Sequence, residues 1–273
     1  MTEQVEANGT SISFKRSGNG PPLLLLHGAE ADHSMFDAFG QLLSDDFTVI
    51  AYDQRDSAGT QNPPTPYGFE ELADDLAALI AALGFERAHV FGTSFGGAIA
   101  QVAAIRHPAR IDHLVLSSTF RIGVSVASLN PDGFPRFAEL RGRLPETLLA
   151  FAEYFFTPSY IAAHPEALAI FTDNRRDAGQ RERRGAVLAQ PIEVSLSDIK
   201  APTLVLAGSE DRLIPPAHTL SLAREIASAH TALISGVGHV GTIQDPAAVA
   251  AEVTAFLQNK KLERFVEEND HGG

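Results

Sequence analysis

Short apolar runs alternate with amphipathic segments along most of this chain. The run Leu23–Leu26 is continuously apolar, which is typical of a central strand covered on both faces, and Thr203–Ala207 is also expected to be a strand. Phe69–Leu83 instead carries its apolar residues at helical spacing, and Gly84 follows as a suitable C-terminal cap. Strand alternating with helix predicts a mostly parallel sheet with helices on both faces.

The same patterns locate the other elements. Strands are expected at residues 11–16, 47–52, 88–91, 111–116 and 230–235, and helices at 35–43, 98–105, 217–226 and 246–257. Between residues 120 and 198 the strand pattern stops, and helical pieces at 137–144, 146–155 and 167–176 replace it. We therefore expect a doubly wound α/β core over residues 1–119 and 199–273, with a helical insertion at 120–198.

Composition limits the classes of partner. The chain has 273 residues, a net charge of −13 and no cysteine. The negative charge argues against nucleic acid, and the lack of cysteine excludes disulfides and thiolate metal sites. The polar N-terminus is unlike a signal peptide, and no apolar run approaches membrane-spanning length. These features predict a soluble cytoplasmic protein that binds neither nucleic acid nor membrane. They leave the oligomeric state, monomer or homodimer, open.

The most informative stretch is Gly92-Thr93-Ser94-Phe95-Gly96, between a predicted strand and a predicted helix. This is the G-x-S-x-G elbow in its expected context. Side chains at either outer glycine would collide with the strand and helix backbones, so both residues must be small. The turn exposes the serine hydroxyl beside the positive end of the helix, which favours an anion there.

Parallel sheets place their sites beyond the carboxyl ends of the strands, which makes the residues after each strand the candidates for chemistry. These candidates are His27, Gly28, Ala29, Asp53, Ser94, Ser117–Thr119, Asp211 and His239. A serine needs a base to remove its proton, and an acidic partner to orient that base.

His239 is the expected base, because it lies in a glycine-rich loop after the last strand, where a base in this chain order belongs. Asp211 is the expected acid, with the adjacent Glu210 as the alternative. The backbone N–H groups of Phe95 and Ala29 are the expected donors to the oxyanion. His27 is expected to brace its loop rather than to transfer protons.

These residues resemble a known superfamily. The order Ser94, Asp211, His239, together with the motifs LLLLHG and GTSFGG, is similar to the α/β-hydrolase fold over about residues 23–257, apart from the middle insertion. The resemblance implies that the insertion is the helical cap that covers the active site and shapes its pocket.

A finer resemblance involves three segments, VIAYDQRDSAGT, PYGFEELADDL and AHVFGTSFGGAIAQV. They are similar to the aclacinomycin methylesterase-like esterase branch, which shares the pair found here as Arg55-Asp56. Ala58 and Gly59 depart from the T-G-R-S usual in that branch.

Three functions are compatible with these residues. The leading hypothesis is a serine hydrolase that cleaves a carboxylic ester or lactone of a small, largely apolar substrate, with no metal or organic cofactor. The alternatives are a C–C bond hydrolase of meta-cleavage-type products and a ligand receptor that retains the triad with little turnover.

Two features of the insertion remain open at this level. One is an arginine run that is interpreted either as a solvated helix face or as a contact for an acidic substrate or partner; it comprises Arg175, Arg176, Arg181, Arg183 and Arg184. The other is a set of aromatic residues that could line an apolar pocket or belong to the core; it comprises Phe36, Phe120, Phe134, Phe151, Tyr154, Phe155 and Phe156.

Overall fold

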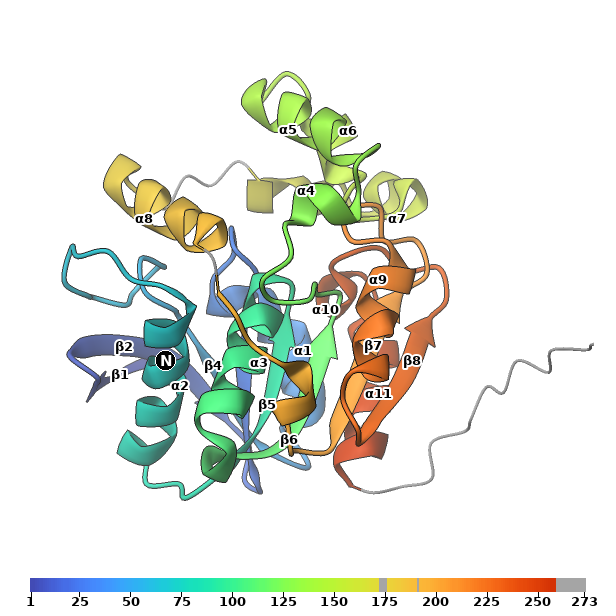
Figure 1. Ribbon diagram of the computed structural model, residues 1–273. Helices are drawn as coiled ribbons and strands as arrows, with labels where there is room; N and C mark the ends of the chain where they lie inside the picture. Colours follow the sequence, from blue (N-terminus) through green and yellow to red (C-terminus); the bar gives the residue numbers. More distant parts are fainter. Residues whose placement is uncertain (172–175, 191, 259–273) are drawn as a thin grey trace, which may run out of the picture.

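The computed structural model describes residues 1–171, 176–190 and 192–258, and within them eight strands form one sheet (Figure 1). Their order across the sheet is β1-β2-β4-β3-β5-β6-β7-β8. The pairs β1–β2 and β2–β4 are antiparallel, and every other neighbouring pair is parallel. The strands are β1 (Thr2–Ala7), β2 (Thr10–Ser17), β3 (Pro22–Leu26), β4 (Thr48–Tyr52), β5 (Ala88–Thr93), β6 (Ile111–Ser117), β7 (Thr203–Gly208) and β8 (Ala229–Ile234).

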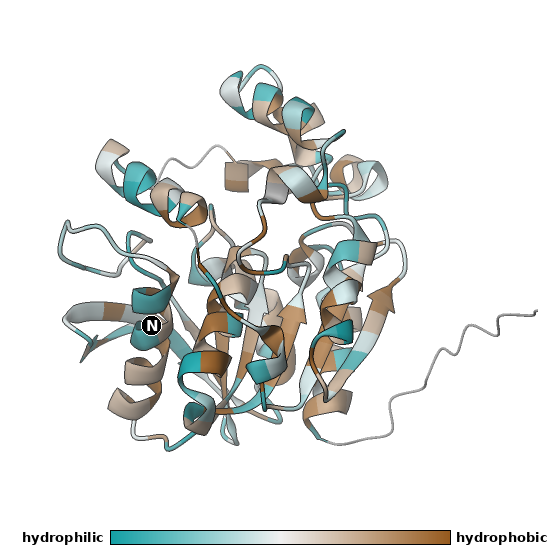
Figure 2. Ribbon diagram, in the orientation of Figure 1, coloured by the Kyte–Doolittle hydropathy of each residue, from teal (hydrophilic) through white to brown (hydrophobic). Residues whose placement is uncertain are grey.

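Helices cover both faces of the sheet because successive strand residues point to opposite sides. Leu24 and Leu26 pack in one core cluster with α2 (Phe69–Ala82) and α3 (Phe95–Arg106). Leu23 and Leu25 pack in another with α1 (Asp37–Leu43) and α11 (Pro246–Leu257). Figure 2 shows the apolar residues concentrated in the central strands between these layers. The predicted α/β fold class is confirmed.

Shorter elements complete the core around this sheet. They are η1 (His33–Phe36), η2 (Pro108–Arg110), η4 (Leu196–Asp198), α9 (Pro216–Ser221), η5 (Leu222–Arg224) and α10 (Gly241–Gln244). Among the described ranges, no helix has the length and apolar character that a membrane span requires.

The chain between β6 and β7 forms a helical layer above the carboxyl ends of the strands (Figure 1). Its elements are α4 (Val126–Leu129), α5 (Phe134–Gly142), α6 (Leu148–Ala152), α7 (Pro158–Ala163), η3 (Pro165–Phe171) and α8 (Ala178–Ala189). We call this layer the cap. The division into a core and a separate cap domain at 120–198 stays a prediction.

Several elements differ from the sequence-based expectation. Strand β1 was not predicted; it pairs with β2 through a turn at Asn8-Gly9, where φ is 49° and 68°. Helix α8 was also not predicted, and it contains the second half of the arginine run. The expected helix at 167–176 is instead a 3-10 segment that ends at Phe171, and residues 172–175 lie outside the described residues.

Candidate active site

Ser94 occupies a strained backbone position between β5 and α3. Its φ of 53° and ψ of −119° are uncommon for a residue with a side chain. A Cβ at Gly92 would lie less than 3.0 Å from the Gly96 backbone, and one at Gly96 would lie as close to the Leu26 backbone. Only glycine fits at these two positions, as expected from the sequence. The tight turn holds Ser94, half-buried, beyond the end of β5.

Asp211 and His239 form a buried hydrogen-bonded pair beyond β7 and β8. His239 Nδ1 lies 2.8 Å from Asp211 Oδ2, and the two side chains are 3% and 0% exposed. Asp211 Oδ1 accepts the N–H groups of Leu213 and Ile214 at 2.9 Å each, which fixes the carboxylate. Glu210, the alternative acid, is exposed.

The pair sets the tautomer of the imidazole. An ionised carboxylate only accepts hydrogen bonds, so His239 Nδ1 carries the proton and donates it to Asp211. The Nε2 atom therefore keeps its lone pair and can accept a proton. This is the arrangement that a general base beside a serine requires.

Hydrogen bonds between the ends of neighbouring strands place Ser94 at the carboxyl end of the sheet, where Asp211 and His239 also lie. Ser94 N–H donates to the Ser117 carbonyl at 3.0 Å, and Ser118 N–H donates to the Leu206 carbonyl at 2.8 Å. None of the hydrogen bonds among the described residues joins Ser94 Oγ to His239. In unliganded sites this contact is often long and shortens only when substrate is bound. The structure thus brings Asp211 and His239 into contact and places Ser94 at their edge of the sheet.

The peptide between Ser94 and Phe95 is held from its carbonyl side. The Ser94 carbonyl oxygen accepts hydrogen bonds from the Thr119 hydroxyl at 2.6 Å and from the Gly97 N–H at 2.9 Å. In a trans peptide the N–H points away from the C=O, so these donors also fix the direction of the Phe95 N–H.

The peptide between Gly28 and Ala29 is oriented in the same way by His27. Gln54 N–H donates to His27 Nε2 at 3.2 Å, so Nδ1 carries the proton and donates to the Gly28 carbonyl at 2.8 Å. The Ala29 N–H then points in the opposite direction. Within the described chain, neither this N–H nor that of Phe95 has a hydrogen-bond acceptor. Two free donors near Ser94 are what an oxyanion hole needs.

His27 stays neutral in this position. Burial, reinforced by the positive charge of Arg184, lowers the pKa of its ring to about 3. The ring is therefore neutral near pH 7, which is consistent with the expected bracing role.

Three members of the arginine run, Arg176, Arg183 and Arg184, bind the core, so these three are neither a solvated face nor free to contact an acidic substrate. Arg184 is buried, and it donates to the carbonyls of Ala29 and Arg55 at 3.1 and 2.9 Å and to Gln54 Oε1 at 3.0 Å. Its guanidinium also lies 4.7 Å from the centroid of the Phe95 ring. One cap arginine therefore contacts the segments that carry both expected oxyanion donors.

Arg176 and Arg183 extend this contact. Arg176 donates to the carbonyls of Asp56 and Ala31 at 2.7 and 2.8 Å. Arg183 forms a bidentate pair with Asp56, at 2.8 Å from Nε and 2.6 Å from Nη2. Burial would raise the pKa of Asp56, but the hydrogen bonds from Arg183, Tyr67 and Asn62 and the charge of Arg183 together lower it. These contacts fix the cap over the core.

The remaining predicted residues have simpler surroundings. Arg181 donates to the Arg176 carbonyl within the cap, and Arg175 lies outside the described residues. Arg55, from the Arg-Asp pair, forms a buried bidentate ion pair with Asp75 at 2.6 and 2.8 Å. Asp53 accepts hydrogen bonds from His33 and Gly59, so it supports the loop fold.

Most of the aromatic residues form a cluster in the cap. Stacked, tilted and edge contacts with centroid distances of 4.8–5.9 Å join Phe134, Phe137, Phe151, Tyr154, Phe155 and Phe171. Phe155 also meets the His239 ring edge-on at 5.8 Å. Phe36 does not belong to this cluster, because it packs with Phe39 and Phe91 in the core under the sheet.

Comparison with known proteins identifies the family. A family model described as alpha/beta hydrolase fold matches residues 21–246, which is more than half of the chain. The chain belongs to the α/β-hydrolase fold family. The superfamily predicted from the sequence is thus confirmed, and the chain is a hydrolase of this fold.

This α/β hydrolase has relatives with several reported activities. It is 30% identical to a poly(3-hydroxyalkanoate) depolymerase from Ectopseudomonas oleovorans, over 88% of this chain and 85% of that one. It is 29% identical to a 2-hydroxymuconate semialdehyde hydrolase from Pseudomonas sp. strain CF600, over 93% of each chain. The solved enol-lactonase from Burkholderia xenovorans LB400 superposes with a TM-score of 0.79 at 29% identity, covering 94% of this chain and 100% of that one.

The residues that the sequence analysis did not single out, Gln54 and the contact of Arg184, lie around the loop that contains His27 and Ala29. Gln54 fixes His27 through its backbone N–H and donates from Nε2 to the His27 carbonyl at 2.9 Å. Arg184 holds Ala29 from the cap. The only sequence signal for Gln54 was its position: it follows Asp53, which comes directly after a predicted strand. Nothing in the sequence paired it with an arginine 130 residues later.

Proposed function

We propose that this hydrolase cleaves a carboxylic ester or lactone of a small, largely apolar substrate through an acyl-enzyme on Ser94. The observation that carries the proposal is the buried Asp211–His239 hydrogen bond of 2.8 Å, held at the sheet edge where Ser94 occupies a strained turn. Catalytic roles for Ser94, Asp211 and His239, and for the N–H groups of Ala29 and Phe95, are part of the proposal.

The reaction proceeds in two halves. Ser94 Oγ attacks the substrate carbonyl as His239 Nε2 takes its proton, and the Phe95 and Ala29 N–H groups bind the oxyanion. The C–O bond then breaks, and His239 returns the proton to the leaving alcohol. Water, deprotonated by the same nitrogen, attacks the acyl-enzyme and releases the acid and Ser94. These steps need no metal or organic cofactor.

The cap supports an apolar substrate rather than an acidic one. Phe155, from the aromatic cluster, packs against the His239 ring. The arginines that could have bound a substrate carboxylate are engaged with the core at Arg176, Arg183 and Arg184. The enol-lactonase and the depolymerase are also named for reactions at ester-type bonds. The resemblance to aclacinomycin methylesterases points in the same direction, and that branch stays a prediction.

The second candidate is hydrolysis of a C–C bond by the same residues. It is favoured by the similarity to the 2-hydroxymuconate semialdehyde hydrolase, which extends over nearly the whole chain. Because one fold hosts many chemistries, this relative keeps the candidate open until substrates are compared.

A substrate panel separates these functions. We expect kcat/KM for p-nitrophenyl esters of short and medium acyl chains, or for lactones, to exceed that for 2-hydroxymuconate semialdehyde by roughly 100-fold, the scale of discrimination that pocket contacts supply. The reverse ranking would establish the C–C hydrolase. No turnover of any of them, by protein that a fluorophosphonate still labels at Ser94, would favour the receptor.

A further inference from the structure

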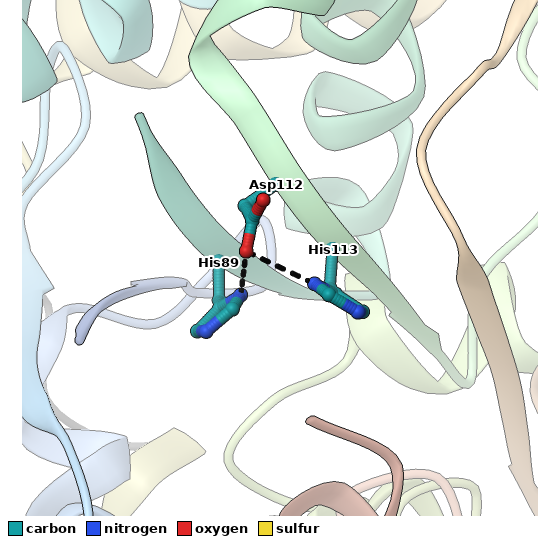
Figure 3. A group of neighbouring side chains, drawn as sticks. All are labelled: His89, Asp112 and His113. Carbon is teal, nitrogen blue, oxygen red and sulfur yellow. Dashed lines mark hydrogen bonds and ion pairs between the residues drawn. The ribbon is translucent and has the colours of Figure 1, made fainter. Parts of the chain in front are cut away.

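Two histidines and an aspartate gather at the end of the sheet opposite Ser94. His89 lies near the start of β5, and Asp112 and His113 lie near the start of β6. Figure 3 shows both imidazoles turned toward the Asp112 carboxylate. Asp112 Oδ2 is 3.1 Å from His113 Nδ1 and 3.3 Å from His89 Nδ1, and the three ligand atoms all lie within 4.8 Å of one another.

An irregular register of the strands brings these side chains together. Ala88 pairs with Ile111 and Val90 with Leu114, so the single residue His89 faces two residues of β6. In a regular strand Asp112 and His113 would point to opposite faces of the sheet. A β-bulge re-aims side chains in this way, and bulges are common next to functional sites.

One nitrogen of the cluster is buried without a hydrogen bond. His89 is 6% exposed, and its Nδ1 has no hydrogen-bond partner, although it points at Asp112. Buried polar atoms are nearly always satisfied, so an unsatisfied one suggests a missing ligand.

The surroundings preorganise the cluster and leave one side accessible. The His89 ring meets Phe47 edge-on at 5.9 Å, and the His113 ring meets Phe256 at 5.6 Å. The Asp112 side chain is 32% exposed, which gives an entry path. Arg87 Nη1 lies 3.3 Å from Asp112 Oδ1, so it engages the oxygen that does not face the imidazoles.

We propose that His89, Asp112 and His113 bind a divalent metal ion of the zinc class. Zinc takes imidazole and carboxylate ligands at about 2.0–2.2 Å in tetrahedral geometry, which sets neighbouring ligand atoms about 3.3–3.5 Å apart. Both separations from Asp112 Oδ2, 3.1 and 3.3 Å, are close to this spacing, and the two histidines bring their ligand atoms within 4.8 Å of each other. The fourth position is left to water. No metal was expected from the sequence, and this site departs from that expectation.

The ion would stabilise the sheet rather than take part in hydrolysis. The residues from His89 to Thr93 span about 13 Å of strand, so the ion lies far from the Ser94 turn. It joins the starts of β5 and β6, the strand from which Ser94 projects and its neighbour. Zinc should therefore raise the thermal unfolding midpoint as its free concentration rises, and should leave ester hydrolysis unchanged.

A second group of potential ligands, Asp32, His33 and Asp53, is less suited to a metal. Asp53 Oδ1 accepts both the backbone N–H and the Nδ1–H of His33, and its Oδ2 accepts the Gly59 N–H. Asp32 Oδ1 accepts the Ser34 N–H as a helix cap. Backbone donors occupy these oxygens and cannot move away without unfolding the loop.

Calorimetric titration of tag-free, chelator-treated full-length protein with Zn²⁺ tests the site. We expect one equivalent to bind saturably. His89→Gln and Asp112→Asn should each weaken binding by more than the roughly 10–100-fold that loss of a second-shell partner costs. His33→Gln, and His164→Gln at the exposed pair with Glu166, should bind zinc as the natural chain does.

Three outcomes would overturn the proposal. They are zinc binding in the natural chain no tighter than in Asp112→Asn, loss of binding in His33→Gln, or equal loss in His164→Gln. His89 is buried, and its replacement could prevent folding. In that case Asp112→Asn decides the question. The Asp112 side chain is partly exposed and asparagine has the same shape, so this variant should fold.

Discussion

Replacing Ser94 with alanine is expected to lower kcat for ester hydrolysis by about 10⁴-fold or more, to the level left by substrate binding and the oxyanion donors. The reason is that no other group can form the acyl-enzyme at this turn. The fold should persist, because the Ser94 hydroxyl makes no hydrogen bond within the described chain and is not part of the core. The measurement is steady-state hydrolysis of a p-nitrophenyl ester, with thermal unfolding followed in parallel.

Ser118→Ala is the matched control for this prediction. Ser118 follows the neighbouring strand β6 and also has a positive φ, of 42°. Its substitution should change kcat by only a few fold. Wild-type turnover by Ser94→Ala would show that the nucleophile is another residue.

Replacing Asp211 with asparagine should reduce kcat by about 10⁴-fold, the size of the effect in the serine-protease worked example. The backbone N–H groups of Leu213 and Ile214 demand an oxygen at the Oδ1 position. The new NH₂ group must therefore occupy the Oδ2 position and donate to His239 Nδ1. That bond moves the ring proton to Nε2, which can then no longer accept the proton of Ser94.

The adjacent carboxylate provides the comparison. Glu210→Gln alters an exposed side chain and should keep nearly full activity. A fully active Asp211→Asn together with an inactive Glu210→Gln would assign the orienting role to Glu210. The pH dependence of kcat, measured for both variants, would separate an altered base from a general loss of folding.

The core could be predicted from the sequence because its strands and helices each carry a local pattern. Leu23–Leu26 is a buried strand in the structure as expected, and the glycines at 92 and 96 are required by backbone contacts. Strand β1 was missed because its residues alternate between exposed and half-buried positions at a sheet edge. The Asn8-Gly9 turn between β1 and β2 was an available hairpin signal.

The docking of the cap could not be predicted, because it depends on residues far apart in the chain. The arginine-rich sequence around Arg184 indicates an exposed residue, yet Arg184 is buried against Ala29, 155 residues earlier. The cluster of His89, Asp112 and His113 could not be predicted either, because a bulge in β6 brings its residues together. Local patterns carry no information on either contact.

The central claim is that Ser94 is the nucleophile made reactive by His239, and the most direct measurement is covalent labelling. The natural chain and His239→Ala would be treated with a fluorophosphonate, and the adduct would be located by peptide mass spectrometry. The account predicts one adduct per chain at Ser94, formed in step with loss of ester hydrolysis and much more slowly in His239→Ala. An adduct at another residue, or complete loss of activity with Ser94 unmodified, would contradict it.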